Sequence, residues 1–298
     1  MGLARSSASP YPALMTTDSH DWFSTAVQAL ADPQGQRVWS IIVSFLGDMA
    51  QGEGAGISSA ALSRVITPLG IKPEAIRVAL HRLRKDGWTD SERRGRGSVH
   101  FLTAHGRAQS AEVTPRIYNR SPCATRDWHL LIAGTAEGLE RLDALSSRAS
   151  AGLIRVNRQT GLGAGAAPAE RAELLTLEAT VATVPTWLRE ELFPPPLRRS
   201  CLALDSALTP LGTPPLLDPL RRACLRTLVV HRWRRIVLRH PHLPATFHPE
   251  DWTGETCRRK VFALLDALPQ PRLLELEQAD PLPDDDATGQ AAGANTGT

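Results

Sequence analysis

Eight basic side chains lie between residues 72 and 96, where the sequence holds only four acids. Six of the eight are arginines, and a guanidinium group forms paired hydrogen bonds to phosphate oxygens and to the edge of guanine. These residue types therefore favour contact with nucleic acid. A run of basic residues is also common on an ordinary solvated surface. Whether these residues contact nucleic acid or only solvent therefore depends on the helices and strands that carry them.

The segment around these residues has the hydrophobic periodicity of three helices. Apolar residues over 38–46 recur at the spacing of one helix face. A glycine-rich loop follows, and Ser58 is placed to cap a second helix that ends at Gly70. A third helix is predicted over 73–86, with proline in the first position, where its missing amide proton costs nothing.

The third predicted helix separates an apolar stripe from a basic face. At 100° per residue, Arg77, His81, Arg82 and Lys85 lie away from the apolar residues. We expect Arg77, His81 and Arg82 to contact base edges or adjacent phosphates, and Lys85 to hold a phosphate. Arg84 lies nearer the apolar stripe and is equally well explained by a pair with an acid of the following strand.

A basic hairpin is predicted directly after this helix. Strand-like runs at 88–92 and 98–102 flank a turn that contains three arginines and two glycines. Three helices followed by such a hairpin is the order of a winged helix-turn-helix, in which the third helix enters the major groove. The hairpin residues expected to contact DNA are Arg93, Arg94, Arg96 and Ser98.

Several motifs resemble those of the PaaX-type transcriptional repressors of phenylacetate catabolism. The matching stretches are 43–48, 69–71, 76–83, 86–88, 102–106, 116–118, 228–235, 239–244 and 250–254. The recognition-helix unit alone also fits GntR-type regulators, so the specific feature is its pairing with the motifs around His231 and Trp252. The resemblance covers about residues 37–265.

The resemblance implies an α+β fold: an N-terminal winged helix-turn-helix, a middle ferredoxin-like domain similar to CRISPR-adaptation endonucleases, and a mainly helical C-terminal domain. The middle domain would have a strand at 128–133, a helix at 139–145 and a later strand at 174–181. Gly134–Ala136 stands where those nucleases carry a metal-binding aspartate, so we expect no catalysis there. The glycine-rich stretch 161–166 lacks the context of a phosphate loop and is expected to be a flexible loop.

The family's effector is an aromatic acyl-CoA, phenylacetyl-CoA, whose phosphates require a basic cluster. Residues 198–260 hold twelve bases and five acids. The effector-binding candidates that the resemblance implies are His231, Arg234, Arg235, Arg239 and Trp252. The competing interpretation places the tryptophans in the core and leaves the arginines solvated or facing DNA.

Other chemistries find little support in the sequence. Three histidines at 240, 242 and 248 lie in a proline-rich loop without the spacing of a metal site. The four cysteines are more than twenty residues apart and suggest buried thiols. No catalytic triad is recognisable, so we expect neither an enzyme nor a cofactor. The alternatives left open are a regulator that answers another acyl-CoA or aromatic acid, and a metal-dependent nuclease-like protein.

Composition and charge suggest how the chain is divided. Its formal charge of +3 conceals a split, because residues 273–298 hold six acids and no base, which leaves +9 on residues 1–272. Proline-rich boundaries and composition predict disordered tails at 1–21 and 277–298 around domains at 22–120, 125–193 and 196–276. No apolar run is long enough to span a bilayer, so we expect a cytoplasmic protein. We also expect it to bind double-stranded operator DNA as a homodimer, with the middle domain forming the dimer contact.

Overall fold

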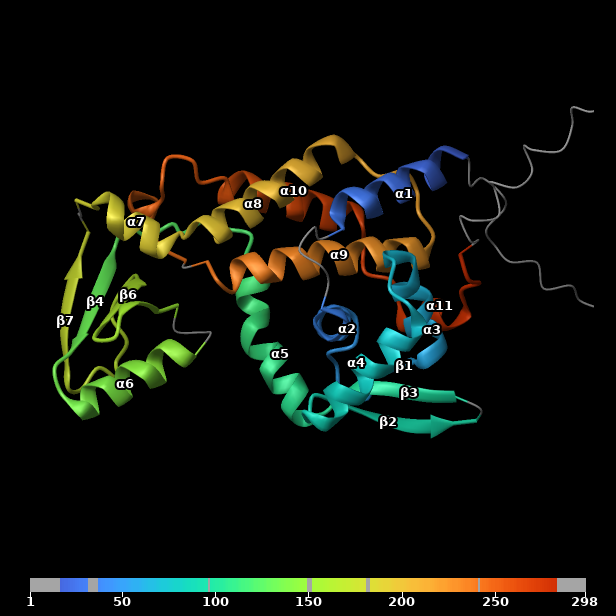
Figure 1. Ribbon diagram of the computed structural model, residues 1–298, viewed down its shortest axis with the longest axis horizontal. Helices are drawn as coiled ribbons and strands as arrows, with labels where there is room; N and C mark the ends of the chain where they lie inside the picture. Colours follow the sequence, from blue (N-terminus) through green and yellow to red (C-terminus); the bar gives the residue numbers. More distant parts are fainter. Residues whose placement is uncertain are drawn as a thin grey trace, which may run out of the picture. The chain divides into compact units, whose positions relative to one another are not determined.

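The computed structural model describes residues 17–31, 37–95, 97–148, 152–180, 183–240 and 242–282, which form a mixed α+β structure (Figure 1). This confirms the expected fold class at the level of α+β. Within these residues the chain divides into two units, each assembled from segments that are distant in sequence. Of the described residues, unit 1 comprises those within 17–31, 115–218 and 232–269, and unit 2 comprises those within 37–114, 219–231 and 270–282.

The helices of unit 2 begin and end at residues that the local sequence marks. They are α2 (Val38–Met49), α3 (Ser59–Ile66), the 3-10 turn η1 (Thr67–Leu69), α4 (Pro73–Lys85), α5 (Ala104–Ile117), the first part of α9 (Pro219–Val237) and α11 (Leu273–Gln278). Ser58 caps α3, because its Oγ accepts a hydrogen bond from the Ala61 amide at 3.1 Å. Gly70 ends η1 with a φ of 78°, a conformation that glycine adopts without steric cost.

A three-stranded antiparallel sheet lies next to these helices in unit 2. Its strands are β1 (Ile57–Ser58), β2 (Thr89–Arg94) and β3 (Gly97–Leu102), in the order β1-β3-β2. The pairing of β2 with β3 runs from Thr89 opposite Leu102 to Arg94 opposite Gly97. The hairpin predicted after the third helix is therefore present, and its turn contains Gly95 with a φ of 60°.

The core of unit 2 forms around α2, which is buried over residues 40–46. The first part of α9 packs in this unit: the Cys224 thiol donates to the Val65 carbonyl oxygen at 3.0 Å. Arg226 on the same helix forms a two-pronged ion pair with Asp48, at 2.6 and 3.1 Å. Because the Asp48 side chain is only 2% exposed, losing either partner would leave a buried charge without compensation.

Unit 1 contains a second antiparallel sheet, covered on one face by α6 (Ala136–Ser147). Its strands are β4 (Trp128–Ala133), β5 (Ile154–Asn157), β6 (Thr160–Ala164) and β7 (Leu174–Ala179), in the order β5-β6-β4-β7. Leu131 and Ala133 of β4 pack against Leu142 and Leu145 of α6. The strands expected near 128–133 and 174–181 and the helix expected at 139–145 are all present.

The expectation of a flexible loop at 161–166 is wrong for most of that stretch, because residues 160–164 form strand β6 and pair with β4 on one side and β5 on the other. The glycines that suggested a loop serve close packing instead. A Cβ at position 163 would overlap the His129 ring, and one at position 161 would press on Leu142 and Leu153. Glycine within a strand often marks such a close approach.

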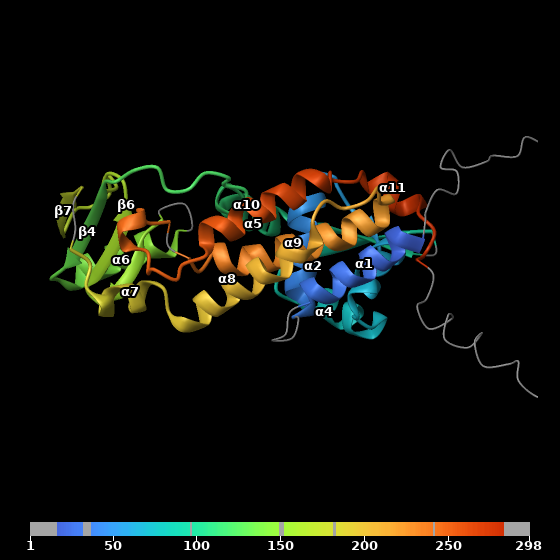
Figure 2. The same ribbon diagram turned by 90° about the horizontal axis from the view of Figure 1, so that it is seen from above.

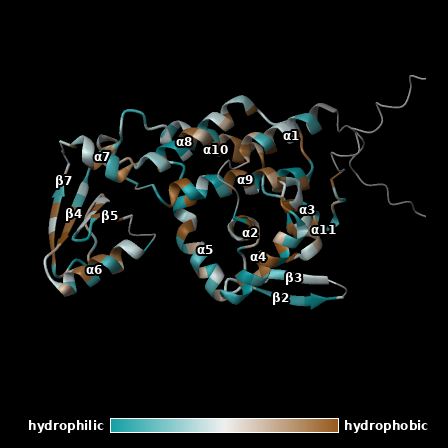
Figure 3. Cartoon of the chain, viewed as in Figure 1, coloured by the Kyte–Doolittle hydropathy of each residue, from teal (hydrophilic) through white to brown (hydrophobic). Residues whose placement is uncertain are grey.

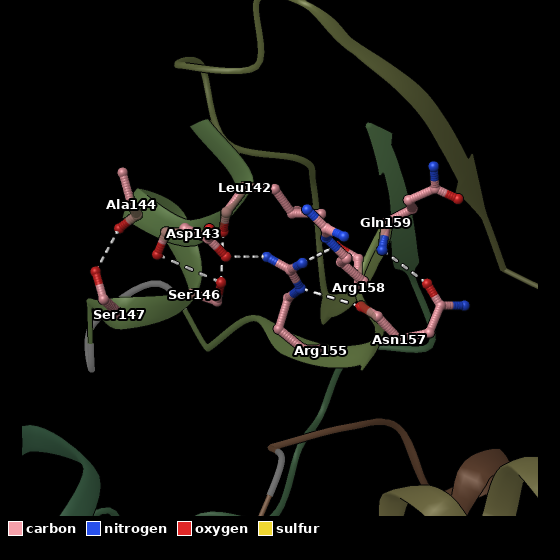
Figure 4. Close-up of polar contacts among 9 residues, drawn as sticks. All are labelled: Leu142, Asp143, Ala144, Ser146, Ser147, Arg155, Asn157, Arg158 and Gln159. Atoms are coloured by element: carbon pink, nitrogen blue, oxygen red, sulfur yellow. Dashed lines mark hydrogen bonds and ion pairs between the residues drawn. The ribbon is translucent and has the colours of Figure 1, made fainter. Parts of the chain in front are cut away.

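Arg155 ties the β5–β6 hairpin to α6 (Figure 4). Its guanidinium group pairs with the Asp143 carboxylate and donates to the carbonyl oxygens of Asn157 and Arg158. The Asn157 side chain in turn accepts from the Gln159 amide at 2.9 Å and shapes the turn. These contacts hold a stretch that is otherwise poor in large apolar residues.

The remaining helices of unit 1 form a layer in which α8 packs against α10 and α1 (Figures 1 and 2). They are α1 (Thr17–Leu30), α7 (Thr186–Leu192), α8 (Pro195–Leu208), η3 (Thr209–Leu211), the rest of α9, η4 (Ala245–Phe247) and α10 (Gly254–Ala267). Lys260 of α10 pairs with Asp205 of α8 at 2.8 Å. Trp22 of α1 donates to the Leu211 carbonyl oxygen at 2.9 Å.

The two segments expected to be disordered tails overlap with helices at their inner ends. Residues 17–21 lie in α1, and α11 ends at Gln278. Residues 1–16 and 283–298 lie outside the described part of the chain. Over the described ranges, no helix combines the length and the apolar character needed to cross a membrane.

Candidate nucleic-acid interface

The basic residues of the predicted third helix project from one side of α4. Arg77, His81, Arg82 and Lys85 are all exposed, whereas the opposite side of the helix is buried. Val78, which lies among the basic residues, is 69% exposed. An exposed apolar side chain on such a face is suited to contact the methyl group of thymine. The 100° period of the helix places Val78 on this face, and its residue type alone does not assign it a role.

The arginines of α4 are held by weak, exposed contacts. Arg77 pairs with Glu74 at 2.7 Å, and both side chains are more than 70% exposed. Arg82 lies 3.5 Å from Asp86 and 5.7 Å from the centroid of the Trp39 ring. Exposed pairs of this kind contribute little to stability, so the arginines are oriented and yet free to exchange partners with a phosphate.

The β2–β3 hairpin carries further arginines beside α4. Arg93 and Arg94 are exposed near its tip, and Arg94 lies 3.6 Å from Glu92. Figure 3 shows hydrophilic colouring along β2. Arg96 lies outside the described residues, and Ser98 is half-buried on β3, where its carbonyl oxygen accepts from Ser59 Oγ at 3.3 Å.

A groove of about 250 Å³ lies between α4, α3 and the hairpin. Its lining includes Arg77, His81 and Ser98, together with Arg84 and His100, which the sequence did not single out as contacts. His100 shares a hydrogen bond of 2.8 Å with Ser59 Oγ. Burial, and then the nearby Arg84 cation, lower the pKa of His100, which favours its neutral form.

The orientation of the hairpin relative to α4 depends on a short junction. Trp88, three residues after the end of α4, donates a hydrogen bond from its backbone amide to the Leu83 carbonyl oxygen at 2.9 Å. Thr103 Oγ1 donates to the Gly87 carbonyl oxygen at 2.6 Å and accepts from the Gly106 amide at 3.0 Å. A Cβ at Gly106 would overlap the Trp88 carbonyl oxygen, so only glycine fits this position.

A pocket of about 290 Å³ in unit 1 gathers four arginines, all described in the structure: Arg199, Arg232, Arg235 and Arg239. Its apolar wall comes from Pro194, Pro196, Leu197, Ala203 and Ile236. The described lining includes no carboxylate. Burial lowers the pKa of Arg232, and burial together with the Arg239 cation lowers that of Arg235. Guanidinium groups remain charged at neutral pH, so the pocket is suited to an anion with an apolar portion.

The five effector candidates taken from the sequence do not all meet in this pocket. Arg235 and Arg239 line it, whereas His231, Arg234 and Trp252 are not among its lining residues. His231 is 1% exposed and its Nδ1 lies 3.2 Å from Ser44 Oγ. Trp252 stacks on His240, with ring centroids 4.6 Å apart. The sequence missed Arg199 and Arg232 because α8 and α9 must pack before their arginines converge.

The tryptophans and histidines near Trp252 form an aromatic cluster in unit 1. Trp233 is buried and donates to the Ile117 carbonyl oxygen at 2.8 Å. Phe193 contacts His240, His248 and Trp252 with centroid distances of 5.0–5.4 Å. In the part of the chain that the structure describes, no three His, Cys, Asp or Glu side chains are grouped to hold a metal ion.

The structure thus defines a class: an α+β protein with an exposed basic helix and hairpin in one unit and an arginine-lined pocket in the other. The family model for PaaX-like protein matches residues 37–106, and that for the PaaX-like protein C-terminal domain matches 213–271. Both models describe PaaX-like proteins, to which this chain is similar over these two stretches.

Two individual proteins are similar over most of the chain. The transcriptional repressor PaaX of Escherichia coli (strain K12) is 29% identical over 257 residues, which cover 74% of this chain and 77% of that protein. The solved structure of the uncharacterized protein Rv0674 from Mycobacterium tuberculosis is 20% identical with a TM-score of 0.46, covering 76% of this chain and 93% of that one.

Proposed function

We propose that this protein is a sequence-specific DNA-binding transcriptional repressor of phenylacetate catabolism, with no enzymatic activity. The observation that carries the proposal is the exposed basic face of α4 beside the arginine-bearing β2–β3 hairpin. The similarity of this chain to the transcriptional repressor PaaX of E. coli supports the same function. In this proposal unit 2 contains a winged helix-turn-helix, with α4 in the major groove and the hairpin as the wing.

The side chains divide into two roles on DNA. Arg77, His81 and Arg82 point from the middle of α4 and would contact base edges or nearby phosphates, with an arginine fork on guanine worth ~1–3 kcal/mol of discrimination. The residues proposed to contact the phosphate backbone of the DNA are Lys85, Arg93, Arg94, Arg96 and Ser98.

The arginine-lined pocket of unit 1 is proposed as the effector site. Arg235 and Arg239, joined by Arg199 and Arg232, would bind the phosphates of phenylacetyl-CoA, and the apolar wall would contact an uncharged portion. An acyl-CoA is larger than a cavity of about 290 Å³, so the pocket would receive only part of it. That His231, Arg234 and Trp252 also contact the effector directly remains a prediction from the sequence.

The β4–β7 sheet supports the proposal of a ferredoxin-like middle domain, and dimerisation through this domain is a further part of the proposal. The strand order β5-β6-β4-β7, with α6 on one face, corresponds to the ferredoxin-like order. Residues 165–173 link β6 to β7 without the second crossover helix of that fold. A homodimer would match the two-fold symmetry of a palindromic operator.

DNA binding is tested by fluorescence anisotropy of the purified protein with the intergenic duplex upstream of its own gene, at fixed salt. Arg77→Ala and Arg82→Ala should each weaken binding about tenfold or more. Arg259→Ala, which removes an exposed arginine from α10, serves as the matched control and should bind like the unmodified protein. Equal binding by all three variants would refute the assignment of α4 as the reading helix.

The effector site is tested by titrating the DNA complex with phenylacetyl-CoA, free phenylacetate and CoA. Only phenylacetyl-CoA should release the DNA. Arg235→Ala with Arg239→Ala should require a higher effector concentration while DNA affinity without effector is unchanged. Release by none of the three compounds would remove the effector assignment and leave the DNA-binding assignment standing.

A further inference from the structure

The basic surface of unit 2 has a counterpart of opposite charge in the same chain. We define this basic surface by residues that are all exposed: Lys72, Arg77, Arg82, Lys85, Arg93 and Arg94. The last 26 residues hold six acids and no base, and three of the acids are consecutive at Asp284–Asp286. Charge complementarity therefore exists between two parts of one molecule.

Helix α11 fixes where the acidic segment begins. Leu276 is fully buried, and the Glu277 carboxylate accepts hydrogen bonds from both the amide and the Oγ of Ser58, each at 2.6 Å. Arg64 of α3 donates to the carbonyl oxygens of Leu276 and Glu277 at 3.0 and 3.1 Å. The end of α11 is thus attached to β1 and α3 in unit 2, and α11 lies beside α3 in Figure 1.

This attachment lies close to the hairpin. Ser58 belongs to β1, which pairs with β3, and β3 carries the second side of the hairpin. From Gln278 to Asp284 the chain advances six residues, a span of at most ~20 Å when extended. The six residues of β3 cover ~20 Å as well, so Asp284–Asp286 can reach the hairpin arginines.

We propose that the acidic segment Asp284–Asp286 docks on the basic surface of unit 2 and competes with DNA for it. The inference rests on the proposed function, since it assigns this surface to DNA. The carboxylates would take the place of backbone phosphates beside Arg93, Arg94 and Lys85. Glu275 and Glu277 do not take part, because they accept hydrogen bonds from the Arg272 amide and from Ser58.

The competition has a defined thermodynamic form. A short tether gives an effective concentration in the millimolar range, so even weak ion pairing occupies the surface for part of the time. The apparent association constant for DNA equals the intrinsic constant multiplied by the fraction of molecules whose basic surface is unoccupied. This fraction is the same for every duplex. A random-sequence duplex is therefore a sufficient probe, and the operator need not be known.

The first measurement is the affinity for a random-sequence 30-base-pair duplex. Replacing Asp284, Asp285 and Asp286 by asparagine in the full chain should tighten binding about three- to tenfold at low salt, and the difference should vanish as salt screens the ion pairs. The control removes three exposed acids from helices of unit 1, with the substitutions Glu137→Gln, Glu140→Gln and Glu190→Gln. This control should leave the affinity unchanged, although it loses the same charge.

The second measurement does not require DNA and uses zero-length carbodiimide coupling of carboxylates to amines. The chain has only three lysines: Lys72 and Lys85 at the two ends of α4, and Lys260 in unit 1. Peptide mass spectrometry should find Asp284–Asp286 coupled to Lys72 or Lys85. The pair of Lys260 with Asp205, 2.8 Å apart, reports that the reagent is active.

The outcomes separate the two proposals. Tighter binding by the asparagine variant together with coupling to α4 supports the docked acidic segment. Equal affinities, or the absence of coupling while Lys260–Asp205 couples, would overturn it. If neither protein binds any duplex, the proposed function fails, and the coupling result alone then decides whether the acidic segment docks.

Discussion

At the residue scale, the candidate interface consists of cations that already have partners within the free protein. Glu74 lies 2.7 Å from Arg77, and Asp86 lies 3.5 Å from Arg82. These acids orient the arginines but also oppose the approach of phosphate. Their effect on DNA affinity should therefore be larger than their effect on stability, because exposed ion pairs contribute ~0.2–1 kcal/mol.

We predict that Glu74→Gln tightens DNA binding several-fold, since it removes a negative charge beside the phosphate contacts and frees Arg77. The unfolding temperature should change little, because both side chains are more than 70% exposed. Anisotropy titrations and thermal unfolding of the same preparations provide the two measurements. Glu137→Gln, also an exposed acid in the first turn of a helix, should leave affinity unchanged; weaker binding by Glu74→Gln would contradict the prediction.

At the element scale, the hairpin should contribute affinity that depends on salt. Each phosphate contact adds about 0.9 to the slope of log K against log salt. Replacing Arg93 and Arg94 by alanine should therefore lower this slope by about two, with little change in preference between duplexes. Titrations at four salt concentrations measure the slope, and Arg259→Ala should keep it. A lower affinity with an unchanged slope would show that these arginines do not contact phosphates.

The junction between α4, the hairpin and α5 can be tested through its glycine. Gly106→Ala should lower the free energy of unfolding by roughly 1–3 kcal/mol, because the added methyl group meets the Trp88 carbonyl oxygen. Gly97→Ala is the matched control on β3, where a Cβ has open space and φ is not positive. Chemical denaturation should distinguish the two variants, and equal stabilities would show that the junction yields without cost.

At the scale of the whole molecule, buried histidines link stability to pH. Burial, and then the neighbouring His248, Arg258, His242 and Arg116, hold the pKa of His240 well below its usual range near 6.5. Burial likewise lowers the pKa of three other histidines, namely His100, His242 and His248. The folded protein therefore binds fewer protons than the unfolded chain just below pH 6.5.

The sign of the effect follows from this difference in bound protons. Stability is fully present above about pH 6.5 and falls with decreasing pH, by at most ~1.4 kcal/mol per pH unit for each such histidine. We predict a falling thermal midpoint between pH 7 and pH 5 and a shallower fall for His240→Gln. His105→Gln, at an exposed position, should keep the original slope. A midpoint that does not change over this range would contradict the prediction.

Local patterns in the sequence predicted four features of unit 2, namely α2, α3, α4 and the β2–β3 hairpin, and the direction of the α4 side chains. The capping hydroxyl of Ser58, the left-handed Gly70 and the proline that opens α4 act through neighbouring backbone, so they are legible without tertiary contacts. The 3.6-residue period likewise placed Arg77, His81 and Arg82 on an exposed face. These are properties of segments shorter than about fifteen residues.

Only the tertiary structure decided features that join distant segments. The strand at 160–164 forms because Gly161 and Gly163 admit Leu142, Leu153 and His129, which lie elsewhere in the chain. The arginine-lined pocket exists because α8 and α9 bring Arg199 beside Arg232, Arg235 and Arg239. The amino-acid composition cannot distinguish arginines that line a pocket from arginines that face solvent. Which of the two occurs depends on the packing of helices and strands that are distant in sequence, and no local pattern encodes that packing.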